Sequence, residues 1–225
     1  MEQLKHVDNM QSTRSKKQFQ LFIKRLFDII FSLIALIPSS IVFLIVAIMI
    51  IKEDGLPVFF KQKRSGKDGK TFLMYKFRSM KVQKASETSV SKPSPYNWTD
   101  GVPDDFVFKS ATSANPNVTR TGAFIRKYSL DELPQFINVL KGEMSIVGPR
   151  PEIIEITKCY NAEQRRRLLV KPGITGLAQA NGRSNMDHGE KMKWDLRYVN
   201  HFSIWLDFKI LLKTVGQVFT GKGSF

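Results

Sequence analysis

The longest apolar run of the chain extends from Ile29 to Ile51 and contains no charged residue. An α-helix of about 20 apolar residues is long enough to cross the hydrocarbon core of a bilayer. The run begins too late and is too long for a simple cleavable signal peptide, and no cleavage pattern of small residues follows it. The pattern therefore predicts a membrane helix, and a single transmembrane helix is its simplest form.

Two features favour instead a hairpin that enters and leaves the membrane on the same side. Basic residues crowd both ends of the run, and such flanks tend to remain in the cytoplasm. Near the middle of the run, Pro38 lacks an N–H and can break the helix, while the hydroxyls of Ser39 and Ser40 can satisfy the freed backbone groups. We therefore expect a re-entrant helix–break–helix segment over residues 19–52, preceded by a basic arm, residues 1–18, on acidic membrane lipids. The flanking basic residues are Arg14, Lys16, Lys17, Lys24 and Arg25 before the run, and Lys52, Lys61, Lys63, Arg64, Lys67 and Lys70 after it.

After the membrane segment, short runs of apolar and polar positions predict a small mixed domain over residues 53–225. Residues 58–60 and 71–77 are rich in β-forming side chains, and the glycines between them, Gly66 and Gly69, predict a β-hairpin. Helical patterns follow, and they cover residues 131–141, about 161–170 and 204–219.

The last helical pattern, residues 204–219, carries apolar residues at i, i+3 and i+4 spacings. It fits a core helix and, equally, an amphipathic helix at the membrane interface, where Trp205 would suit headgroup depth. Residues 84–117, rich in Ser, Thr, Pro, Asn and Asp, predict a long loop. The expected fold is α+β and mainly helical: a monotopic membrane protein with a re-entrant hairpin and amphipathic interface helices around a small domain that contains the β-hairpin.

The charge of the chain narrows the class of partner. Its 225 residues include 35 Lys and Arg against 20 Asp and Glu, which leaves a formal net charge of +15. Such an excess indicates an anionic partner: nucleic acid, an acidic lipid surface or a phosphorylated substrate. Cys159 is the single cysteine, which excludes an internal disulfide and a multi-cysteine metal site, and the three histidines have no zinc-like spacing. Any metal is therefore expected to be a hard ion such as Mg²⁺ with oxygen ligands.

Asp131 and Glu132 are the strongest candidates for chemistry, because they begin a predicted helix. One interpretation is structural: Ser129 caps the helix, and the two acids complement its dipole. The other interpretation is catalytic. A carboxylate at a helix N-terminus stays ionised and can attack a phosphoryl group, whose phosphate the same N–H groups would then stabilise. Glu132 could help to hold Mg²⁺ or to move a proton.

Several cations occupy ordered positions from which they could bind a substrate phosphate. Arg126 lies five residues before Asp131. Lys76 and Arg78 alternate along the second strand of the hairpin and so share a face, although a solvated strand edge would show the same alternation. Arg150 is enclosed by two prolines, which order the backbone around a guanidinium suited to bidentate phosphate recognition.

Six motifs, in order along the chain, resemble those of the bacterial sugar transferases, the small monotopic phosphoglycosyl transferases that initiate glycoconjugate assembly on polyprenyl phosphate. The resemblance runs from about Lys24 to Phe219, and several independent motifs at suitable intervals make it specific. There are departures: Ile37-Pro38-Ser39 stands where family members often have Ser-Pro, Asn115-Pro116-Asn117 replaces Asp-Pro-Arg, and residues 84–108 look like an insertion. The motifs are Lys24-Arg25-x-x-Asp28, Arg64-x-Gly66-x-x-Gly69, Lys76-Phe77-Arg78-Ser79-Met80, Ser129-Leu130-Asp131-Glu132-Leu133-Pro134-Gln135, Gly148-Pro149-Arg150-Pro151-Glu152 and Lys171-Pro172-Gly173-Ile174-Thr175-Gly176.

The resemblance implies an enzyme of the bacterial cytoplasmic membrane with its catalytic domain on the cytoplasmic face. Such enzymes transfer a sugar-1-phosphate from a UDP-sugar to polyprenyl (undecaprenyl) phosphate and release UMP, the initiating step of surface polysaccharide or glycoconjugate synthesis. By this resemblance Asp131 attacks the β-phosphate and forms a covalent intermediate, Glu132 supports it, and both carboxylates lie near Mg²⁺. Nucleic acid is not among the implied partners, and a homodimer is left open. The implied substrate-binding residues are Lys76, Arg78, Arg126, Arg150 and Asp195.

Two other functions fit part of the pattern. A non-enzymatic membrane adaptor that recruits nucleic acid or acidic lipid explains the charge and the anchor, but not the ordered series of acids and arginines around Asp131. A direct transferase that binds both substrates at once, with Asp131 only holding Mg²⁺, uses the same residues as the covalent mechanism. The sequence does not distinguish among UDP-sugars, and residues 84–117 or the C-terminal segment are the regions expected to select the sugar.

Overall fold

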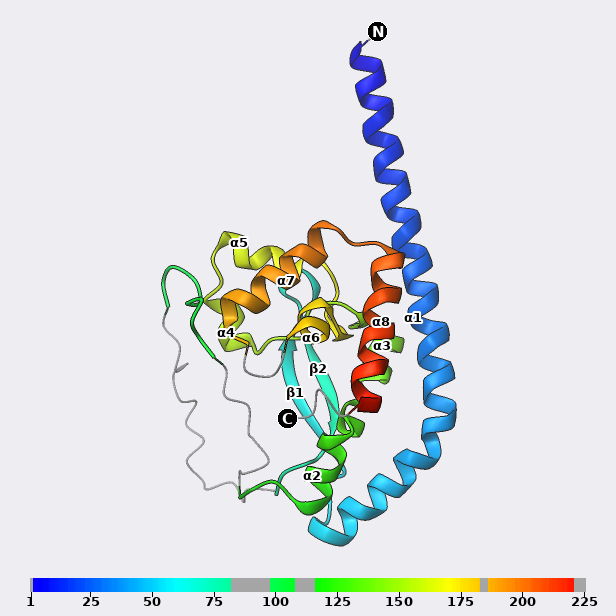
Figure 1. Ribbon diagram of the computed structural model, residues 1–225, viewed down its shortest axis with the longest axis vertical. Helices are drawn as coiled ribbons and strands as arrows, with labels where there is room; N and C mark the ends of the chain where they lie inside the picture. The colour runs from blue at the N-terminus through cyan, green and yellow to red at the C-terminus, as the bar shows by residue number, and fades with distance from the viewer. Residues whose placement is uncertain (1, 82–97, 108–115, 183–185, 221–225) are drawn as a thin grey trace.

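The computed structural model of the chain describes residues 2–81, 98–107, 116–182 and 186–220. Within these ranges one long helix, α1 (Glu2–Asp54), runs along one side of a body made of short helices and two small sheets (Figure 1). This confirms the prediction of a mainly helical chain with small sheets and a long apolar helix near its N-terminus. The other elements, in chain order, are β1 (Phe59–Ser65), η1 (Lys67–Gly69), β2 (Thr71–Phe77), α2 (Arg120–Lys127), η2 (Leu130–Glu132), α3 (Gln135–Lys141), β3 (Ser145–Val147), α4 (Ile154–Lys158), α5 (Ala162–Arg165), η3 (Arg166–Leu169), β4 (Gly173–Thr175), α6 (Leu177–Asn181), α7 (His188–Asn200) and α8 (Ile204–Thr220).

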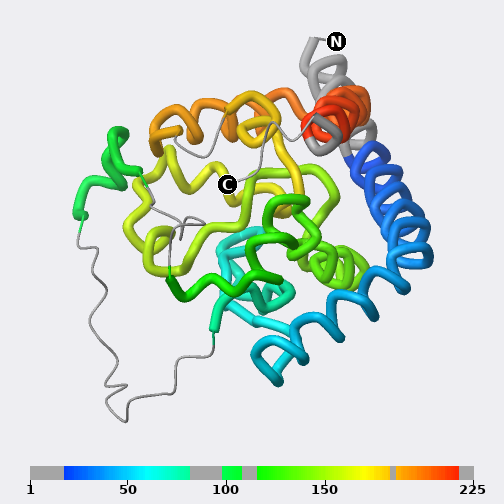
Figure 2. Tube along the Cα trace, turned by 60° about the horizontal axis from the view of Figure 1, so that its bottom comes forward, coloured from blue at the N-terminus to red at the C-terminus, as the bar shows by residue number. Residues whose placement is uncertain are grey.

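The helix α1 continues through Pro38 without interruption. Its last part turns away from the direction of its first part and ends beside α2 (Figures 1 and 2). Ser39 Oγ donates a hydrogen bond to the Ala35 carbonyl at 2.6 Å, and Ser40 Oγ donates to the Ile37 carbonyl at 2.7 Å. A proline removes one helical hydrogen bond, and serine hydroxyls that bond the preceding turn bend a helix. Where the sequence predicted a break, the structure therefore has a bent but continuous helix.

The outer face of α1 is covered with exposed apolar side chains. Residues 18–54 form a 37-residue stretch long and apolar enough to cross a membrane, and 11% of its most apolar window is buried inside the protein. At 1.5 Å per residue this stretch is about 55 Å long, against about 30 Å for the hydrocarbon core of a bilayer. Its exposed surface and its length are compatible with membrane association along a bent or tilted path. Side chains that are 63–73% exposed include Phe19, Phe22, Ile34, Ile37, Ile41 and Leu44.

Polar side chains fasten the first part of the apolar stretch to the body of the protein. Asp28 is 2% exposed and accepts a hydrogen bond from the Ile146 N–H at 2.9 Å. One turn earlier, Lys24 Nζ donates to Asp207 Oδ2 at 2.6 Å and to the Val147 carbonyl at 3.0 Å. These bonds tie α1 to β3 and to α8 through residues that lie more than a hundred positions apart in the chain.

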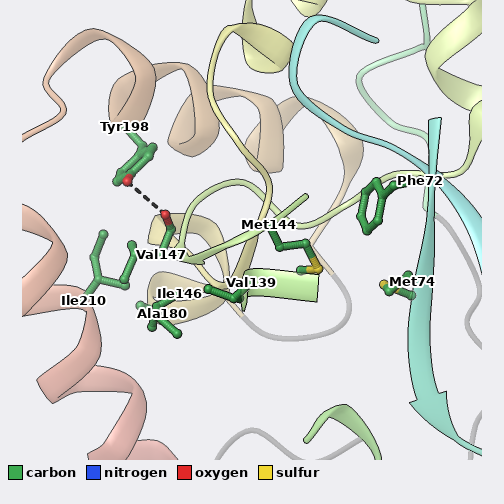
Figure 3. Packing of buried hydrophobic residues seen from close by; sticks show 9 residues of the cluster. All are labelled: Phe72, Met74, Val139, Met144, Ile146, Val147, Ala180, Tyr198 and Ile210. Carbon is green, nitrogen blue, oxygen red and sulfur yellow. Dashed lines mark hydrogen bonds between the residues drawn. The ribbon is translucent and has the colours of Figure 1, made fainter. Parts of the chain in front are cut away.

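The main hydrophobic core lies between the hairpin, the β3–β4 pair and the C-terminal helices (Figure 3). The hydroxyl of Tyr198, from α7, crosses this core and donates to the Val147 carbonyl at 3.1 Å. Because β3 leads directly into the turn that carries Arg150, the core fixes the position of that turn. Its buried members are Phe72, Met74, Val139, Met144, Ile146, Val147, Ala180, Tyr198 and Ile210.

The strands β1 and β2 form the predicted hairpin, with Phe59 opposite Phe77 at its open end. The 3₁₀ turn η1 joins them, and β1 extends beyond the predicted residues 58–60 as far as Ser65. Arg64, which the sequence placed in the turn, therefore belongs to a strand. The antiparallel pairing continues over the whole of β2, so the direction of every side chain on β2 is set by the register.

The helix α8 has a buried face and an exposed apolar face. Ile210 is 2% exposed and belongs to the core, and Asp207 is 4% exposed. On the opposite face Trp205, Phe208 and Leu212 are 63%, 45% and 58% exposed. Figure 1 shows α8 beside the middle of α1, and there Lys24 donates a hydrogen bond to Asp207 of α8. One face of α8 is thus a core face, and its opposite face is apolar and exposed.

The predicted loop, residues 84–117, falls largely outside the described residues, as does Asn115. Its described middle part, residues 98–107, is packed against the body of the protein. Val102 is 3% exposed and joins a cluster with side chains of α4 and α7. Its backbone N–H donates to Gln164 Oε1 at 3.0 Å. This part of the predicted loop is therefore ordered by burial and by hydrogen bonds.

Candidate active site

The chain reaches the two adjacent carboxylates through a tight reversal after α2. Ser129 has a positive φ of 54°, and its side chain makes no cap hydrogen bond. Asp131 and Glu132 then lie in the single 3₁₀ turn η2, and α3 begins at Gln135. The predicted capping by Ser129 is wrong, because an N-cap residue needs an extended backbone that Ser129 does not have. The helix start predicted at Asp131 is likewise too early.

Burial dominates the electrostatics of Asp131, whose side chain is 13% exposed. Burial raises the pKa of Asp131 from 3.8 to about 6, and the adjacent charge of Glu132 adds to the rise. Three cations, Lys76, Arg150 and Arg126, oppose it. The pKa of Asp131 is therefore raised by burial, whereas the field of a helix N-terminus alone would lower it. With a pKa near 6, Asp131 is nevertheless mostly ionised at neutral pH.

Glu132 has the opposite electrostatic state. Its oxygen Oε1 accepts hydrogen bonds from Lys76 Nζ at 2.7 Å and from Arg150 Nη2 at 2.8 Å. Burial alone would raise the pKa of Glu132, but Arg150 and Lys76 together hold it well below its usual range. Glu132 is therefore a fixed negative charge with two cations attached to it, beside a carboxylate that titrates near pH 6.

Lys76 reaches both carboxylates from β2. Its Nζ lies 2.7 Å from Glu132 Oε1 and 3.8 Å from Asp131 Oδ2. The helix that follows the carboxylates is fastened to the same strand by the buried amide of Asn138, which accepts a hydrogen bond from the Tyr75 N–H at 3.0 Å. The hairpin and α3 thus hold the lysine and the two acids in one place.

Arg150 is brought to Glu132 by the close packing of two turns. The strands β3 and β4 pair in parallel, and the Gly173 N–H donates to the Pro149 carbonyl at 2.9 Å. A Cβ atom on Gly148 or on Gly173 would collide with the backbone of the other turn, so glycine is needed at both positions. The two glycines thus allow the two turns to approach each other closely.

Arg126 approaches the site from α2, whose N-terminus is capped by the end of α1. The carboxylate of Glu53 accepts hydrogen bonds from the N–H groups of Arg120 at 2.7 Å and Thr121 at 2.8 Å. Arg126, near the end of the same helix, is close enough to lower the pKa of Asp131. The membrane helix is therefore in direct contact with an element that carries a predicted site residue.

Arg78 lies elsewhere. It is 6% exposed, and its Nη2 donates to the Asp54 carbonyl at 2.9 Å and to the Gly55 carbonyl at 2.6 Å. The strand β2 ends at Phe77, so the alternation that predicted a shared face for Lys76 and Arg78 stops before Arg78. The Arg78 guanidinium therefore binds the chain at the end of α1, and it does not contact Glu132 in the way that Lys76 does.

Asp195 is buried beneath the site. It is 1% exposed, and its Oδ2 accepts a hydrogen bond from Arg167 Nε at 2.7 Å. Burial raises the pKa of Asp195, and the charge of Arg167 opposes the rise. Arg167 in turn donates from Nη2 to the Arg150 carbonyl at 2.8 Å. Asp195 is thus connected to the Arg150 turn through the side chain of Arg167, in the interior of the protein.

No site role was predicted from the sequence for Arg167 or for Arg64, although Arg64 belongs to one of the six motifs. Arg64 Nη1 donates to the Pro151 carbonyl at 3.3 Å, from the strand that the sequence had cut short. Arg167 ends a run of three arginines that looks like a solvated face. The capping box that starts α5 was a usable signal, because it fixes the helical phase. The predicted helix over residues 161–170 then tightens into η3, and this turns Arg167 inward.

The carboxylates fit Mg²⁺ unequally. Among the described residues no three His, Cys, Asp or Glu side chains gather as a metal site, so the protein would supply at most two carboxylates here. Glu132 Oε1 is engaged by two cations, whereas the Lys76 ammonium lies 3.8 Å from Asp131 Oδ2. Mg²⁺ is often bound through one or two carboxylates together with substrate phosphates and waters. Asp131 fits this donor set, and Glu132 would have to release a cation first.

Comparison with known proteins identifies the family. A family model described as bacterial sugar transferase matches residues 19–221. The chain is 44% identical, over 95% of its length, to the galactosyl transferase CpsE of Streptococcus agalactiae, of which it covers 46%. It is 40% identical, over 90% of its length, to the uncharacterized sugar transferase EpsL of Bacillus subtilis, of which it covers 90%. It is also 40% identical to the UDP-glucose:undecaprenyl-phosphate glucose-1-phosphate transferase of Escherichia coli, of which it covers 41%.

The chain therefore spans less than half the length of two of these three relatives and most of the third. The matched residues include the apolar helix, the hairpin, both carboxylates and the Arg150 turn. A family model that covers nine tenths of the chain and a relative matched over nine tenths of both lengths agree on one assignment. The chain belongs to the bacterial sugar transferase family.

Proposed function

We propose that the protein transfers a sugar-1-phosphate from a UDP-sugar to polyprenyl phosphate through a covalent phosphosugar-aspartyl intermediate on Asp131. The family and the name of the Escherichia coli relative support the overall reaction. The observation that carries the covalent step is the contrast between the two acids. Asp131 keeps a carboxylate that no side chain holds within 3.5 Å among the described contacts, whereas Glu132 is clamped by Lys76 and Arg150.

In the first half-reaction a carboxylate oxygen of Asp131 attacks the β-phosphorus of the UDP-sugar. A bond forms between this oxygen and the phosphorus, and the bond from the phosphorus to the bridging oxygen breaks. UMP leaves with the electron pair of that bond. Lys76 and Arg150, already assembled by Glu132, lie where they can stabilise the charge on the phosphoryl oxygens, which is the main requirement of phosphoryl transfer.

In the second half-reaction a phosphate oxygen of polyprenyl phosphate attacks the phosphorus of the aspartyl adduct. The bond between Asp131 and the phosphorus breaks, the carboxylate is restored, and a polyprenyl diphosphate sugar is released. Each step exchanges one phosphate acceptor for another, so no external energy source is needed. Asp131, with a pKa raised to about 6, is a much better leaving group than hydroxide, and at neutral pH it is mostly ionised and can act as a nucleophile.

Mg²⁺, bound by Asp131 and the substrate phosphates, would neutralise charge on the diphosphate. Glu132 acts in this proposal mainly through the two cations that it holds. Arg126, five residues before Asp131 in the sequence, adds positive charge that would interact with the second phosphate of the substrate. The basic composition of the chain would concentrate two anionic substrates and acidic lipids at the same surface.

We further propose that α1 enters and leaves the cytoplasmic leaflet, so that both its ends and the catalytic domain face the cytoplasm. Basic residues at both flanks, the bend of α1 and the exposed apolar surfaces of α1 and α8 support this arrangement. A re-entrant helix would place the carboxylates near headgroup height, where polyprenyl phosphate presents its charge.

The test uses the purified chain in detergent with a UDP-sugar and no polyprenyl phosphate. A panel of UDP-glucose, UDP-galactose and UDP-N-acetylated sugars identifies the donor by UMP release. With that donor we expect about one UMP per active site and a matching mass increase on the peptide that contains Asp131. Asp131→Asn should show neither. Turnover that requires both substrates, with no adduct and with most activity kept by Asp131→Asn, would replace the covalent mechanism with direct transfer.

A further inference from the structure

Arg167 occupies an interior position in which protein atoms engage each of its three side-chain nitrogens. Nε donates to Asp195 Oδ2 at 2.7 Å, Nη1 donates to the Tyr160 hydroxyl at 2.7 Å, and Nη2 donates to the Arg150 carbonyl at 2.8 Å. The side chain of Arg167 is 7% exposed and that of Asp195 is 1% exposed. Such a guanidinium is directed by its partners, and it has little freedom to move toward a ligand.

The backbone that Arg167 holds has few other ways to be fixed. Pro149 and Pro151 have no N–H, so the turn around Arg150 lacks two of its ordinary donors. The three successive carbonyls of this turn are instead held from three separate parts of the chain. The Pro149 carbonyl accepts from the Gly173 N–H at 2.9 Å, and the Pro151 carbonyl accepts from Arg64 Nη1 at 3.3 Å. The middle carbonyl, that of Arg150, accepts from Arg167.

The middle contact matters most for the site, because the same residue carries the guanidinium that meets Glu132. Arg150 Nη2 lies 2.8 Å from Glu132 Oε1, yet the Arg150 side chain is 41% exposed. A side chain with that exposure has several rotamers available, and its head is placed only if its backbone is fixed. Arg167 therefore acts on the site through the Arg150 backbone, at a distance from the reacting atoms.

The partners of Arg167 explain why it stays in place. A buried arginine is costly unless its charge is paired and its donors are satisfied. Asp195 supplies the opposite charge, from α7, and Tyr160, just after α4, supplies an acceptor. Glu152 adds a weaker contact, with its Oε2 3.8 Å from Arg167 Nη1. The buried pair of Asp195 and Arg167 thus holds a donor directed at the Arg150 carbonyl.

We propose that Arg167, held by Asp195, is a positioning residue for the transfer reaction: it fixes the Arg150 carbonyl and thereby places the Arg150 guanidinium against Glu132 and the substrate diphosphate. This inference rests on the proposed function. It also gives Asp195, which the family resemblance suggested as a substrate-binding residue, a supporting task in the interior.

The test is a double-mutant cycle between Arg167 and Arg150, read as kcat and KM for the UDP-sugar that the wild-type chain turns over. Arg167→Lys keeps a positive charge near Asp195 but loses the planar fork. It is expected to lower kcat/KM about 10- to 100-fold, the range typical of partners that orient a functional group. In an Arg150→Ala background the same change should lower kcat/KM by less than about 3-fold, because the residue through which it acts is absent.

Equal losses in both backgrounds would overturn the proposal, since a purely structural arginine weakens the fold whether or not Arg150 is present. Thermal unfolding of all four proteins separates the two effects. A loss of activity that comes only from a weakened fold is accompanied by a lower melting temperature, whereas a loss of positioning is not. Arg165→Lys is the matched control. Its Nε bonds the Tyr160 carbonyl at 2.9 Å from the same segment, it is exposed, and it should leave the cycle unchanged.

If Arg167→Lys does not fold, Asp195→Asn provides the same cycle. This substitution removes the charge that holds Arg167 but keeps the shape of the Asp195 side chain. The effect of Asp195→Asn on kcat/KM should likewise depend on the presence of Arg150. Equilibrium binding of UDP, measured by calorimetry on the same variants, gives a second readout that does not need turnover. Absence of UMP release by the wild-type chain would refute the proposed function. Normal wild-type turnover with an additive cycle would refute the positioning role alone.

Discussion

Asp131 and Glu132 are neighbours in the chain, and the structure gives them opposite ionisation behaviour. Burial raises the pKa of Asp131 to about 6, whereas Lys76 and Arg150 hold the pKa of Glu132 well below its usual range. Both cations bond Glu132 Oε1, whereas Lys76 Nζ lies 3.8 Å from Asp131 Oδ2. The difference in pKa follows from this difference in contacts. Two chemically similar acids thus become a fixed charge and a group that can change its state.

The first prediction concerns stability and pH. The pKa of Asp131 is raised in the folded protein from 3.8 to about 6, so ionising this group costs folding free energy. Below about pH 4 the carboxyl is protonated in both states and there is no cost. The cost grows as pH rises through the window from about 4 to 6 and is complete above it. Asp131→Asn should therefore be more stable than wild type above pH 6, by about 1–3 kcal/mol, with the gain disappearing toward pH 4.

Thermal unfolding in detergent with a metal chelator, at several pH values from 4 to 8, measures this gain. The chelator is needed because a bound cation would favour the ionised form. Asp105→Asn is the control, because Asp105 is exposed and its substitution should change the stability by less than about 0.5 kcal/mol. A variant of Asp131 that is less stable than wild type at pH 7.5 would contradict the prediction.

The second prediction concerns Lys76. Lys76→Gln removes the ammonium that lies between the two carboxylates, and Glu132 then keeps only the contact with Arg150. We expect UMP release from the donor to slow by about 100-fold, the size seen when one charge-stabilising donor is removed from an active site. The matched control is Lys61→Gln on the other strand of the hairpin, where Lys61 lies over the ring of Tyr75. It should change the rate less than about 3-fold. Equal effects of the two substitutions would show that Lys76 acts only through the general charge of the surface.

Local patterns in the sequence were sufficient for the parts of the site that depend on neighbouring residues. The hairpin with Lys76, the adjacent acids and the proline-bounded Arg150 were all predicted, because turn chemistry and alternation decide them. The structure brings these parts together at 2.7–2.8 Å around Glu132. The apolar helix was predicted for the same reason, since its length and composition are local properties.

The errors concern features that long-range contacts decide. Ser129 looked like a cap, but the reversal after α2 gives it a positive φ. Arg78 was predicted to share a strand face with Lys76, but β2 ends at Phe77, and Arg78 donates to two carbonyls at the end of α1. The pKa of Asp131 depends on burial by elements that lie far away in the sequence, and no local pattern reports that burial. Arg167 was missed because only the packing of α7 against η3 shows which of three arginines faces inward.

The third prediction concerns the attachment of the membrane helix. Lys24 and Asp207 form an ion pair at 2.6 Å, with side chains 12% and 6% exposed. Lys24→Met leaves the buried carboxylate of Asp207 without its cation, which should cost about 3–5 kcal/mol of unfolding free energy. The double variant Lys24→Met, Asp207→Leu should recover part of this loss, because no unpaired charge remains.

Denaturant unfolding in detergent measures these differences. The control is Lys67→Met, which breaks the exposed pair between Lys67 and Asp68, whose side chains are 48% and 51% exposed. An exposed pair contributes little, so the control should change the stability by less than about 1 kcal/mol. A loss for Lys24→Met no larger than that of the control would mean that α1 is not fastened to the body through this pair.

The fourth prediction concerns the path of α1 in the membrane. Single cysteines at positions 16 and 63 flank the apolar stretch, and Cys159→Ser first removes the one native thiol. If α1 is re-entrant, a membrane-impermeant thiol reagent should label both positions from the cytoplasmic side of inverted vesicles, and neither from the outside of intact cells.

Pro38→Leu sharpens the test, because a leucine restores the missing helical hydrogen bond and removes the clash that favours a bend. A straight helix of this length is longer than the hydrocarbon core and can cross the bilayer. In this variant position 16 should become accessible from outside, while position 63 stays on the cytoplasmic side. Labels on opposite sides in the chain with Pro38 intact would show that α1 spans the membrane, and the carboxylates would then have to reach polyprenyl phosphate by another arrangement of the catalytic domain.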